Sequence, residues 1–174
     1  MNFVAMDVET ANSRIFSICQ IGIAEYAAGG LVSEWETLVN PQGDFDSCNI
    51  AIHGITDEVV FDAPILPEVY GTISQRLKGK IVVCHTQFDR IALARALKRY
   101  KLRPIRCAWL DSAQVARRAW EQFSKRGYGL KNVCAFLGYE FDHHNALADA
   151  KAAGFIILEA CRHAGLNIGD WLHR

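Results

Sequence analysis

Apolar residues recur at every second position in several early stretches of the chain, and this period predicts β-strands. Segment 2–8 has apolar side chains on both faces: Val4, Met6 and Val8 on one, and Phe3 and Ala5 with Asp7 on the other. A strand of this kind is typical of the centre of a sheet covered on both sides. Residues 17–26 and 31–39 predict two further strands, joined by a hairpin turn at residues 27–30.

The pattern changes after the break at residues 40–43, where a loop with short helical pieces is expected to run through Ala63. Short apolar runs then alternate with segments of helical period. They predict strands over 80–84 and 105–110, and helices over 66–78, 87–100, 111–123, 130–137 and 146–163. An antiparallel meander followed by alternating strands and helices predicts an α/β fold, a mixed five-stranded sheet flanked by helices.

The amino-acid composition predicts a single globular domain over residues 1–174. The chain is 51% hydrophobic and 22% charged, which suits one globular core. It has no run of ~20 apolar residues, no signal peptide, and six cysteines without a C-x-x-C pair, so we expect a cytoplasmic protein away from membranes. A net charge of zero divides into −10 over residues 1–70 and +10 over 71–174. That division predicts either internal neutralisation or a basic surface for a polyanion.

Acidic residues stand at the ends of several predicted elements. Asp7 and Glu9 lie two residues apart at the end of the first strand, so both carboxylates share one side of the sheet and could share a cation. A solvated turn is the alternative. Asp89 falls in the first turn of a predicted helix, where Thr86 and Asp89 could instead form a reciprocal cap.

The last long helix carries the fourth acid. Asn145 could cap this helix, which places His144 at its mouth and Asp149 one turn inside, on an otherwise apolar face. A buried acid needs a counter-charge, such as a metal ion, whereas an acid at the edge of the apolar stripe would not. If the four carboxylates converge, their hard oxygen ligands suit Mg²⁺ or Mn²⁺ rather than zinc, and a neighbouring histidine suits proton removal from water.

In this order and spacing, the motifs resemble those of the DEDDh 3′–5′ exonucleases. The matching residues are Asp7-x-Glu9, Asp89 within His85-x-x-Phe88-Asp89, and His144-x-Ala146-x-x-Asp149, with Ala51-Ile52-His53-Gly54-Ile55-Thr56 as a further family-typical segment. The resemblance runs from about residue 3 to residue 158, and is strongest to the branch containing the epsilon proofreading subunit of bacterial DNA polymerase III and its stand-alone relatives. One position departs from the family pattern: Thr86 stands where Asn is usual, and we expect it to affect local geometry rather than metal binding.

The resemblance implies a ribonuclease-H-like fold and a metal-dependent 3′–5′ exonuclease that releases nucleoside 5′-monophosphates from single-stranded DNA, in proofreading or repair. It implies two divalent cations, Mg²⁺ or Mn²⁺, held by Asp7, Glu9, Asp89 and Asp149, with Asp7 between them. His144 is the implied general base, and its neighbour His143 is expected to face away from Asp149. The implied contacts to the terminal nucleotide are Thr10, Ile52, His53 and Phe88.

Several alternatives stay open at the level of sequence. Ile52 and Phe88 could be core residues, and the basic run from Arg95 to Arg106 could be a solvated helix face or a strand-binding surface. RNA could replace DNA, in RNA trimming or oligoribonucleotide clearance. A non-cutting, nucleic-acid-binding polymerase accessory module is disfavoured because all four acids are present. Association with a DNA polymerase is a possible partnership, although we expect free-standing action.

Overall fold

The computed structural model describes residues 2–173, so the first and last residues of the expected domain 1–174 lie outside the described residues. One mixed sheet of five strands organises the chain, in the order β3-β2-β1-β4-β5. Its strands are β1 (Asn2–Thr10), β2 (Ile18–Ala27), β3 (Gly30–Leu38), β4 (Ile81–Cys84) and β5 (Ala108–Asp111). The first three form the expected antiparallel meander, whereas β4 and β5 run parallel to β1.

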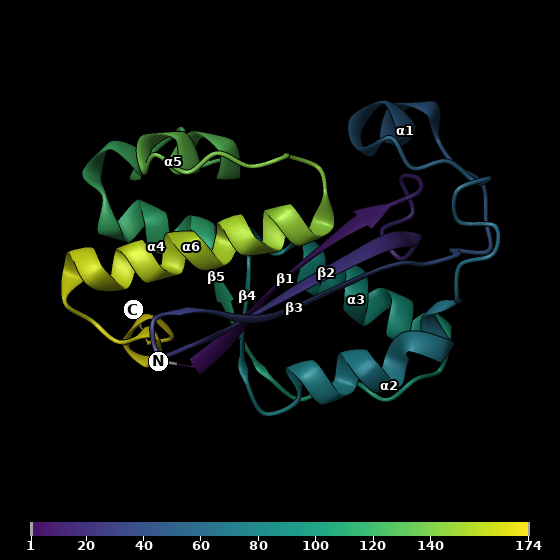
Figure 1. Cartoon of the computed structure of the whole chain (residues 1–174), viewed down its shortest axis with the longest axis horizontal. Coiled ribbons are helices and arrows are strands. Elements are labelled where there is room, and N and C mark those ends of the chain that lie inside the picture. Colours follow the sequence, from purple (N-terminus) through teal and green to yellow (C-terminus); the bar gives the residue numbers. More distant parts are fainter. Residues whose placement is uncertain (1, 174) are drawn as a thin grey trace.

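Helices cover both faces of this sheet (Figure 1). Helix α6 (Ala146–Ala164) lies across one face with α4 (Ser112–Ala119) and α5 (Leu130–Phe136) beyond it, and α2 (Leu66–Leu77) and α3 (Phe88–Arg99) cover the other. The predicted alternation along β1 is confirmed. Phe3 and Ala5 enter the core on the α6 side, while Val4, Met6 and Val8 enter the core on the α2 and α3 side.

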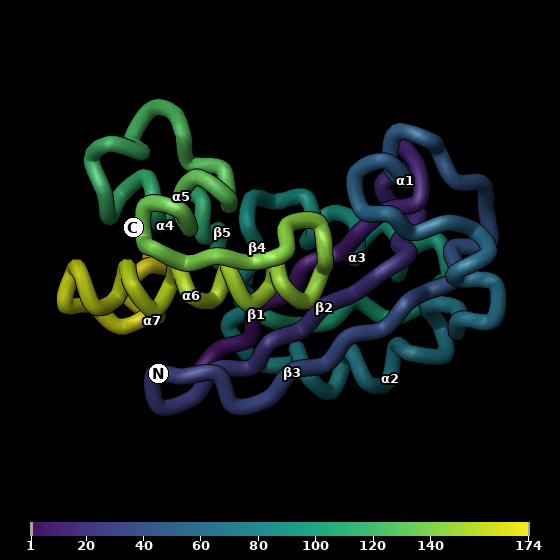
Figure 2. Tube along the Cα trace, turned by 45° about the horizontal axis from the view of Figure 1, so that its top comes forward, coloured from purple at the N-terminus to yellow at the C-terminus, as the bar shows by residue number. Residues whose placement is uncertain are grey.

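Three short helices complete the chain. Helix α1 (Ser47–His53) lies beyond the end of β1, as Figure 2 also shows, and it confirms the helical piece expected before Ala63. A 3₁₀ turn, η1 (Glu121–Phe123), follows α4, and α7 (Ile168–Trp171) lies near the C-terminal end. The structure therefore confirms the fold class, and it confirms the predicted long elements apart from the helix expected over 111–123.

Two predicted boundaries were wrong. The fifth strand begins at Ala108 rather than Ile105, and the helix expected over 111–123 is two separate pieces. Asp111 is not helical but caps α4, since its carboxylate accepts hydrogen bonds from the N–H groups of Ala113 and Gln114. Trp120 has extended backbone angles between α4 and η1. Its side chain is buried in the core, so tertiary packing interrupts a helical pattern that continues in the sequence.

Candidate active site

Asp7 and Glu9 lie at the C-terminal end of β1 on the face covered by α6. In the ladder with β2, Asp7 is opposite Gly22 and Glu9 is opposite Gln20, and the register shifts just after Glu9. Both side chains are partly exposed. The predicted sharing of one side of the sheet is therefore confirmed, and this side is the one that meets the first turn of α6.

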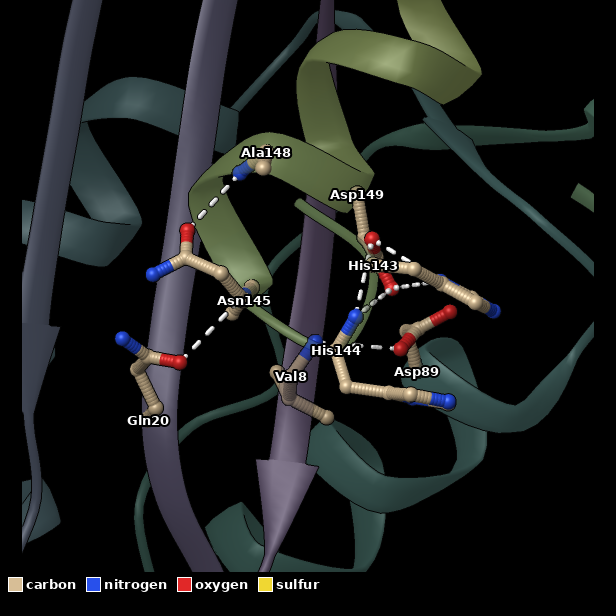
Figure 3. A network of polar contacts seen from close by, with 9 residues as sticks. Val8, Gln20, Asp89, His143, His144, Asn145, Ala148 and Asp149 are labelled. Carbon is tan, nitrogen blue, oxygen red and sulfur yellow. Dashed lines mark hydrogen bonds and ion pairs between the residues drawn. The ribbon is translucent and has the colours of Figure 1, made fainter. Parts of the chain in front are cut away.

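The first turn of α6 approaches β2 so closely that only glycine fits opposite Asp7. A Cβ on Gly22 would lie 2.3 Å from the backbone carbonyl carbon of Ala146. Gln20 fixes the same turn, because its Oε1 accepts a 3.1 Å hydrogen bond from the N–H of Ala146. Asn145 caps α6 as predicted, accepting from the N–H of Ala148 at 3.0 Å. Figure 3 shows Gln20 and Asn145 side by side at this helix start.

Asp149 is thereby brought to the two acids of β1. It is 4% exposed, so the expectation of a buried acid on an apolar stripe is confirmed over the alternative of an edge position. One carboxylate oxygen from each of Asp7, Glu9 and Asp149 lies within 4.8 Å of the other two. Residues 142 positions apart thus form one cluster of oxygen ligands.

Asp89 joins the cluster from α3. It is 2% exposed, and its Oδ1 accepts a 3.1 Å hydrogen bond from the N–H of Val8, the residue between Asp7 and Glu9. The alternative in which Thr86 and Asp89 cap each other is wrong. The N–H of Thr86 donates to Asp111 instead, and the N-cap residue of α3 makes no side-chain cap.

The four carboxylates repel one another. Burial raises the pKa of Glu9 to about 8, with further increases from Asp149 and Asp89. Burial also raises the pKa of Asp89 to about 7 and that of Asp7 well above its ordinary value, and charge repulsion within the cluster adds to the shift at Asp7. Within residues 2–173 no Lys or Arg forms an ion pair with any of the four. Oxygen ligands in this state fit divalent cations such as Mg²⁺ or Mn²⁺, which would supply the missing positive charge.

Two histidines lie at the edge of the cluster (Figure 3). His143 Nδ1 is 3.1 Å from Oδ2 of Asp149, so the expectation that His143 faces away from this acid is wrong. His144 contributes its backbone N–H to the same carboxylate, and a ring nitrogen of each histidine lies within 4.8 Å of an Asp149 oxygen. The two rings stack with centroids 3.9 Å apart. Spacing along the helix could not predict this, because both residues precede α6 and His144 has a positive φ of 72°.

Two of the expected nucleotide contacts are exposed. Ile52 on α1 is 54% exposed and Phe88 at the start of α3 is 43% exposed, so the alternative of core packing is wrong for both. Both side chains are therefore available to contact a ligand. A nucleotide base or sugar would cover such surface without being read for sequence.

Thr10 and His53, the other two expected nucleotide contacts, are joined to each other by a hydrogen bond. Thr10 is buried, and its carbonyl oxygen lies 3.2 Å from Nε2 of His53 and accepts a 2.7 Å hydrogen bond from Asn49. Nδ1 of His53 accepts from the N–H of Ile55, so the proton resides on Nε2, which donates to Thr10. Burial lowers the pKa of His53, in keeping with a neutral ring. These residues hold α1 against the end of β1.

Thr86 occupies a left-handed backbone conformation with φ of 75°. A β-branched residue is costly there, whereas Asn tolerates this region well. The expectation that this position concerns local geometry agrees with its backbone. Its N–H donates to Oδ1 of Asp111 at 3.1 Å, which ties the start of α3 to the end of β5.

A mixed sheet of this order with clustered carboxylates at the end of its first strand defines a nuclease of the ribonuclease-H-like class. The chain belongs to the exonuclease family that is also called RNase T, whose family model matches residues 4–156. The resemblance read from the motifs is confirmed at this level. No helix within residues 2–173 is both long and apolar enough to cross a membrane.

Similar sequences include DNA polymerases III of the PolC type. The chain is 28% identical over 159 residues to that of Oceanobacillus iheyensis, covering 89% of this chain and 11% of the relative. It is 25% identical over 179 residues to that of Bacillus subtilis, covering 98% of this chain and 12% of the relative. The chain thus spans about a ninth of the length of these relatives.

Solved structures share the fold. Exonuclease X in complex with 5′ overhanging duplex DNA has a TM-score of 0.80 at 20% identity, with 98% of each chain covered. Exonuclease I of E. coli in complex with a dT13 oligonucleotide has a TM-score of 0.82 at 13% identity, covering 94% of this chain and 42% of that one. A 3′-exonuclease bound to a histone mRNA stem-loop has a TM-score of 0.77 at 15% identity, covering 94% and 64%.

Proposed function

We propose that residues 1–174 act as a single 3′–5′ exonuclease domain that hydrolyses the terminal phosphodiester of single-stranded DNA and releases nucleoside 5′-monophosphates. One observation carries the proposal: oxygen ligands of Asp7, Glu9 and Asp149 lie within 4.8 Å of one another, next to the buried Asp89. Family membership supports hydrolysis of nucleic acid, and the polymerase relatives support DNA as the polymer.

Asp7, Glu9, Asp89 and Asp149 would hold two divalent cations, Mg²⁺ or Mn²⁺. When bound, such cations neutralise the phosphodiester and lower the pKa of water. Burial and mutual repulsion raise the pKa values of these carboxylates, and the positive charge of bound cations would favour their ionised forms. Hydrogen bonds from Val8 to Asp89 and from His144 to Asp149 orient these two carboxylates before any ligand binds.

His144 accepts the proton of the attacking water at a ring nitrogen. Burial and the neighbouring His143 hold the pKa of His144 below its ordinary value, so the ring is neutral at physiological pH, as a base must be. A bond forms between the water oxygen and the phosphorus atom, and the bond from phosphorus to the O3′ atom of the preceding nucleotide breaks. That oxygen leaves and takes a proton from solvent. Ile52 and Phe88 hold the terminal nucleotide by contact with its base and sugar.

We further propose that this chemistry takes place in the cytoplasm at DNA 3′ ends, in proofreading or repair, alone or beside a DNA polymerase. The polymerase relatives support action beside a DNA polymerase. The RNA alternative would place the same chemistry on the 3′ ends of RNA, and a single assay can compare the two polymers.

The test uses DNA and RNA strands of matched sequence and length, labelled at the 5′ end in one set and at the 3′ end in another. With Mg²⁺ or Mn²⁺ we expect DNA to shorten one nucleotide at a time from its 3′ end, releasing 5′-monophosphates, faster than RNA. An Asp7→Ala variant should release none above background. Equal degradation by this variant would exclude the cluster as the catalytic centre, and faster RNA degradation would reassign the substrate.

A further inference from the structure

A preformed apolar groove lies on the other flank of α3, outside the proposed catalytic machinery. Its volume is about 460 Å³, which suits the side chains of a short peptide. It runs between α3 and the segment 101–109. Apolar side chains form its floor, and basic side chains stand at its rim.

The segment 101–109, which forms the wall of the groove opposite α3, is held by three hydrogen bonds to other parts of the chain. The N–H of Leu102 donates to Leu97 at 2.9 Å, the hydroxyl of Tyr70 donates to Arg103 at 3.0 Å, and the N–H of Gly79 donates to Arg106 at 2.8 Å. A ligand that enters the groove would therefore not have to order this segment first. Preorganisation of this kind lowers the entropic cost of binding.

The rim of the groove carries only positive charge. Arg90, Lys98 and Lys101 are exposed, and none forms an ion pair with any residue between 2 and 173. The lining includes no acid. The complementary ligand therefore combines an apolar side chain for the floor with negative charges on either side.

The groove also faces away from the expected nucleotide contact. Successive residues of an α-helix are rotated by about 100°, so Arg90 lies about 200° around α3 from Phe88. Ala94 and Leu97 continue the Arg90 side, whereas Arg95 lies close to Phe88. Lys98 lies between the two sides. The basic run 95–106 therefore divides between two surfaces, and a ligand in the groove leaves Phe88 uncovered.

The side chains of the groove floor favour a peptide ligand over a nucleic acid strand. A single strand is held by bases stacked on flat aromatic rings and by cations in series. This floor is mostly aliphatic, formed by Leu93, Leu97, Leu102 and Ile105, with Trp109 as its aromatic member. An aliphatic floor of this kind suits Leu, Ile or Phe side chains.

We propose that this groove is a docking site for a protein partner, which binds through a short segment with an apolar anchor flanked by Asp or Glu. The partner would be held beside the exonuclease site without entering it. This role is separate from the proposed hydrolysis, because binding requires neither metal nor nucleic acid.

Fluorescence anisotropy with three labelled hexapeptides tests the proposal, in EDTA and without DNA. The peptides are Glu-Asp-Leu-Phe-Glu-Asp, Glu-Asp-Ser-Ser-Glu-Asp and Lys-Lys-Leu-Phe-Lys-Lys, which vary the anchor and the charge separately. We expect the first to bind roughly tenfold tighter than either of the others. Equal binding of the three would overturn the proposal.

Two sets of variants locate the binding. Ala94→Trp fills the groove from an exposed helical position and should weaken the first peptide roughly tenfold or more, while exonuclease activity and the melting temperature stay unchanged. The pair Lys98→Glu/Lys101→Glu should do the same, whereas Lys125→Glu/Arg126→Glu, at exposed positions elsewhere, should not. Unchanged peptide binding in Ala94→Trp would overturn the proposal. So would displacement of the peptide by a dT oligonucleotide, which would assign the groove to a nucleic acid strand.

Discussion

Helices α6 and α1 both bring residues to the end of β1, but they are attached to the sheet in opposite ways. Helix α6 is seated through its backbone on Gly22 and is buried along its inner face. Helix α1 has no buried residue, and hydrogen bonds from Asn49 and His53 to the carbonyl oxygen of Thr10 hold it in place.

This difference separates two kinds of site residue. Packing sets the position of Asp149, so the geometry of the carboxylates is as rigid as the core itself. Hydrogen bonds at the surface set the position of Ile52, where few contacts would be lost if α1 moved. Changes at the α6 contact should therefore reduce stability and activity together, and changes on α1 should reduce substrate binding alone.

Gly22→Ala should break the α6 contact and have the largest effect. The added methyl group would meet the backbone of Ala146, which cannot move without displacing Asp149. We expect the free energy of unfolding to fall by about 3 kcal/mol, with loss of most activity. Urea denaturation checks the first result and nucleotide release the second. Gly71→Ala is the matched control: it lies within α2 with open space around its Cβ, and should instead stabilise by about 1 kcal/mol.

Asp7→Asn should separate activity from stability at the rigid site. Loss of this carboxylate should lower the rate of nucleotide release by roughly a hundredfold or more. The metal-free variant should melt at a higher temperature than the metal-free parent, because one of four mutually repelling carboxylates is gone. Thermal melting in EDTA measures this, and a lower melting temperature would show that Asp7 is stabilised by something other than cations.

Ile52→Ala tests the second half of the comparison. The free energy of unfolding should change by less than about 0.5 kcal/mol because the side chain is exposed. The KM for a DNA strand should rise by roughly tenfold. Ile55→Ala, three residues away but buried, should lower the free energy of unfolding by about 2–4 kcal/mol. A large stability loss at Ile52 with no change in KM would contradict the assignment.

The pH dependence of stability should also reveal the cluster. With raised pKa values, including about 8 at Glu9 and about 7 at Asp89, the folded chain binds more protons than the unfolded chain between about pH 4 and 8. The stability of the metal-free protein should therefore fall as pH rises toward 8. Saturating Mg²⁺ should flatten this decline, and denaturation curves at pH 6.5 and 8 with and without Mg²⁺ measure the difference.

His85 should change the stability of the fold with pH in the opposite direction to the carboxylates. Burial lowers its pKa from the ordinary 6.5 to about 4, and its ring nitrogens lie 2.8 Å from the Ser112 hydroxyl and 2.9 Å from the Tyr128 carbonyl. The unfolded chain binds this proton more readily, so the contribution of His85 to stability should be lost as pH falls from 6.5 toward 4, against the gain from the carboxylates. A His85→Gln variant should therefore gain more stability than the parent over this fall in pH, and equal slopes of stability against pH in the two proteins would contradict this account of His85.

Thr86→Asn should have the smallest effect. Asn tolerates the left-handed backbone of this position better than a β-branched residue, so the free energy of unfolding should rise by about 0.5–1 kcal/mol. Thr86→Val, which keeps the branching, should give no such gain. Chemical denaturation of the two variants compares them, and equal stability would show that branching is not the cost.

The parts of this fold that could be predicted from sequence depend on local periodicity. Alternation along β1 predicted both faces of the sheet and the shared side of Asp7 and Glu9, because neighbouring residues alone decide where a strand's side chains point. The cap at Asn145 was predictable for the same reason.

The rest depends on contacts between distant segments. The need for glycine at position 22 comes from Ala146, which is 124 residues away, and the contact of Gln20 with α6 has the same origin. His143 was expected to face away from Asp149 because only His144 has Ala and Asp at the offsets of the family motif, and a motif does not show how the backbone turns before the helix. The late start of β5 and the break at Trp120 likewise come from core packing rather than local pattern.

The distance in sequence between the two halves of the cluster bears on how the protein is made. Asp7, Glu9 and Asp89 leave the ribosome well before Asp149, and α6 can dock on β2 only after most of the chain has been synthesised. N-terminal segments begin to fold first during translation. A nascent chain therefore carries three of its four acids without the helix that completes the cluster, and the proposed nuclease can become active only after residues 146–164 have left the ribosome.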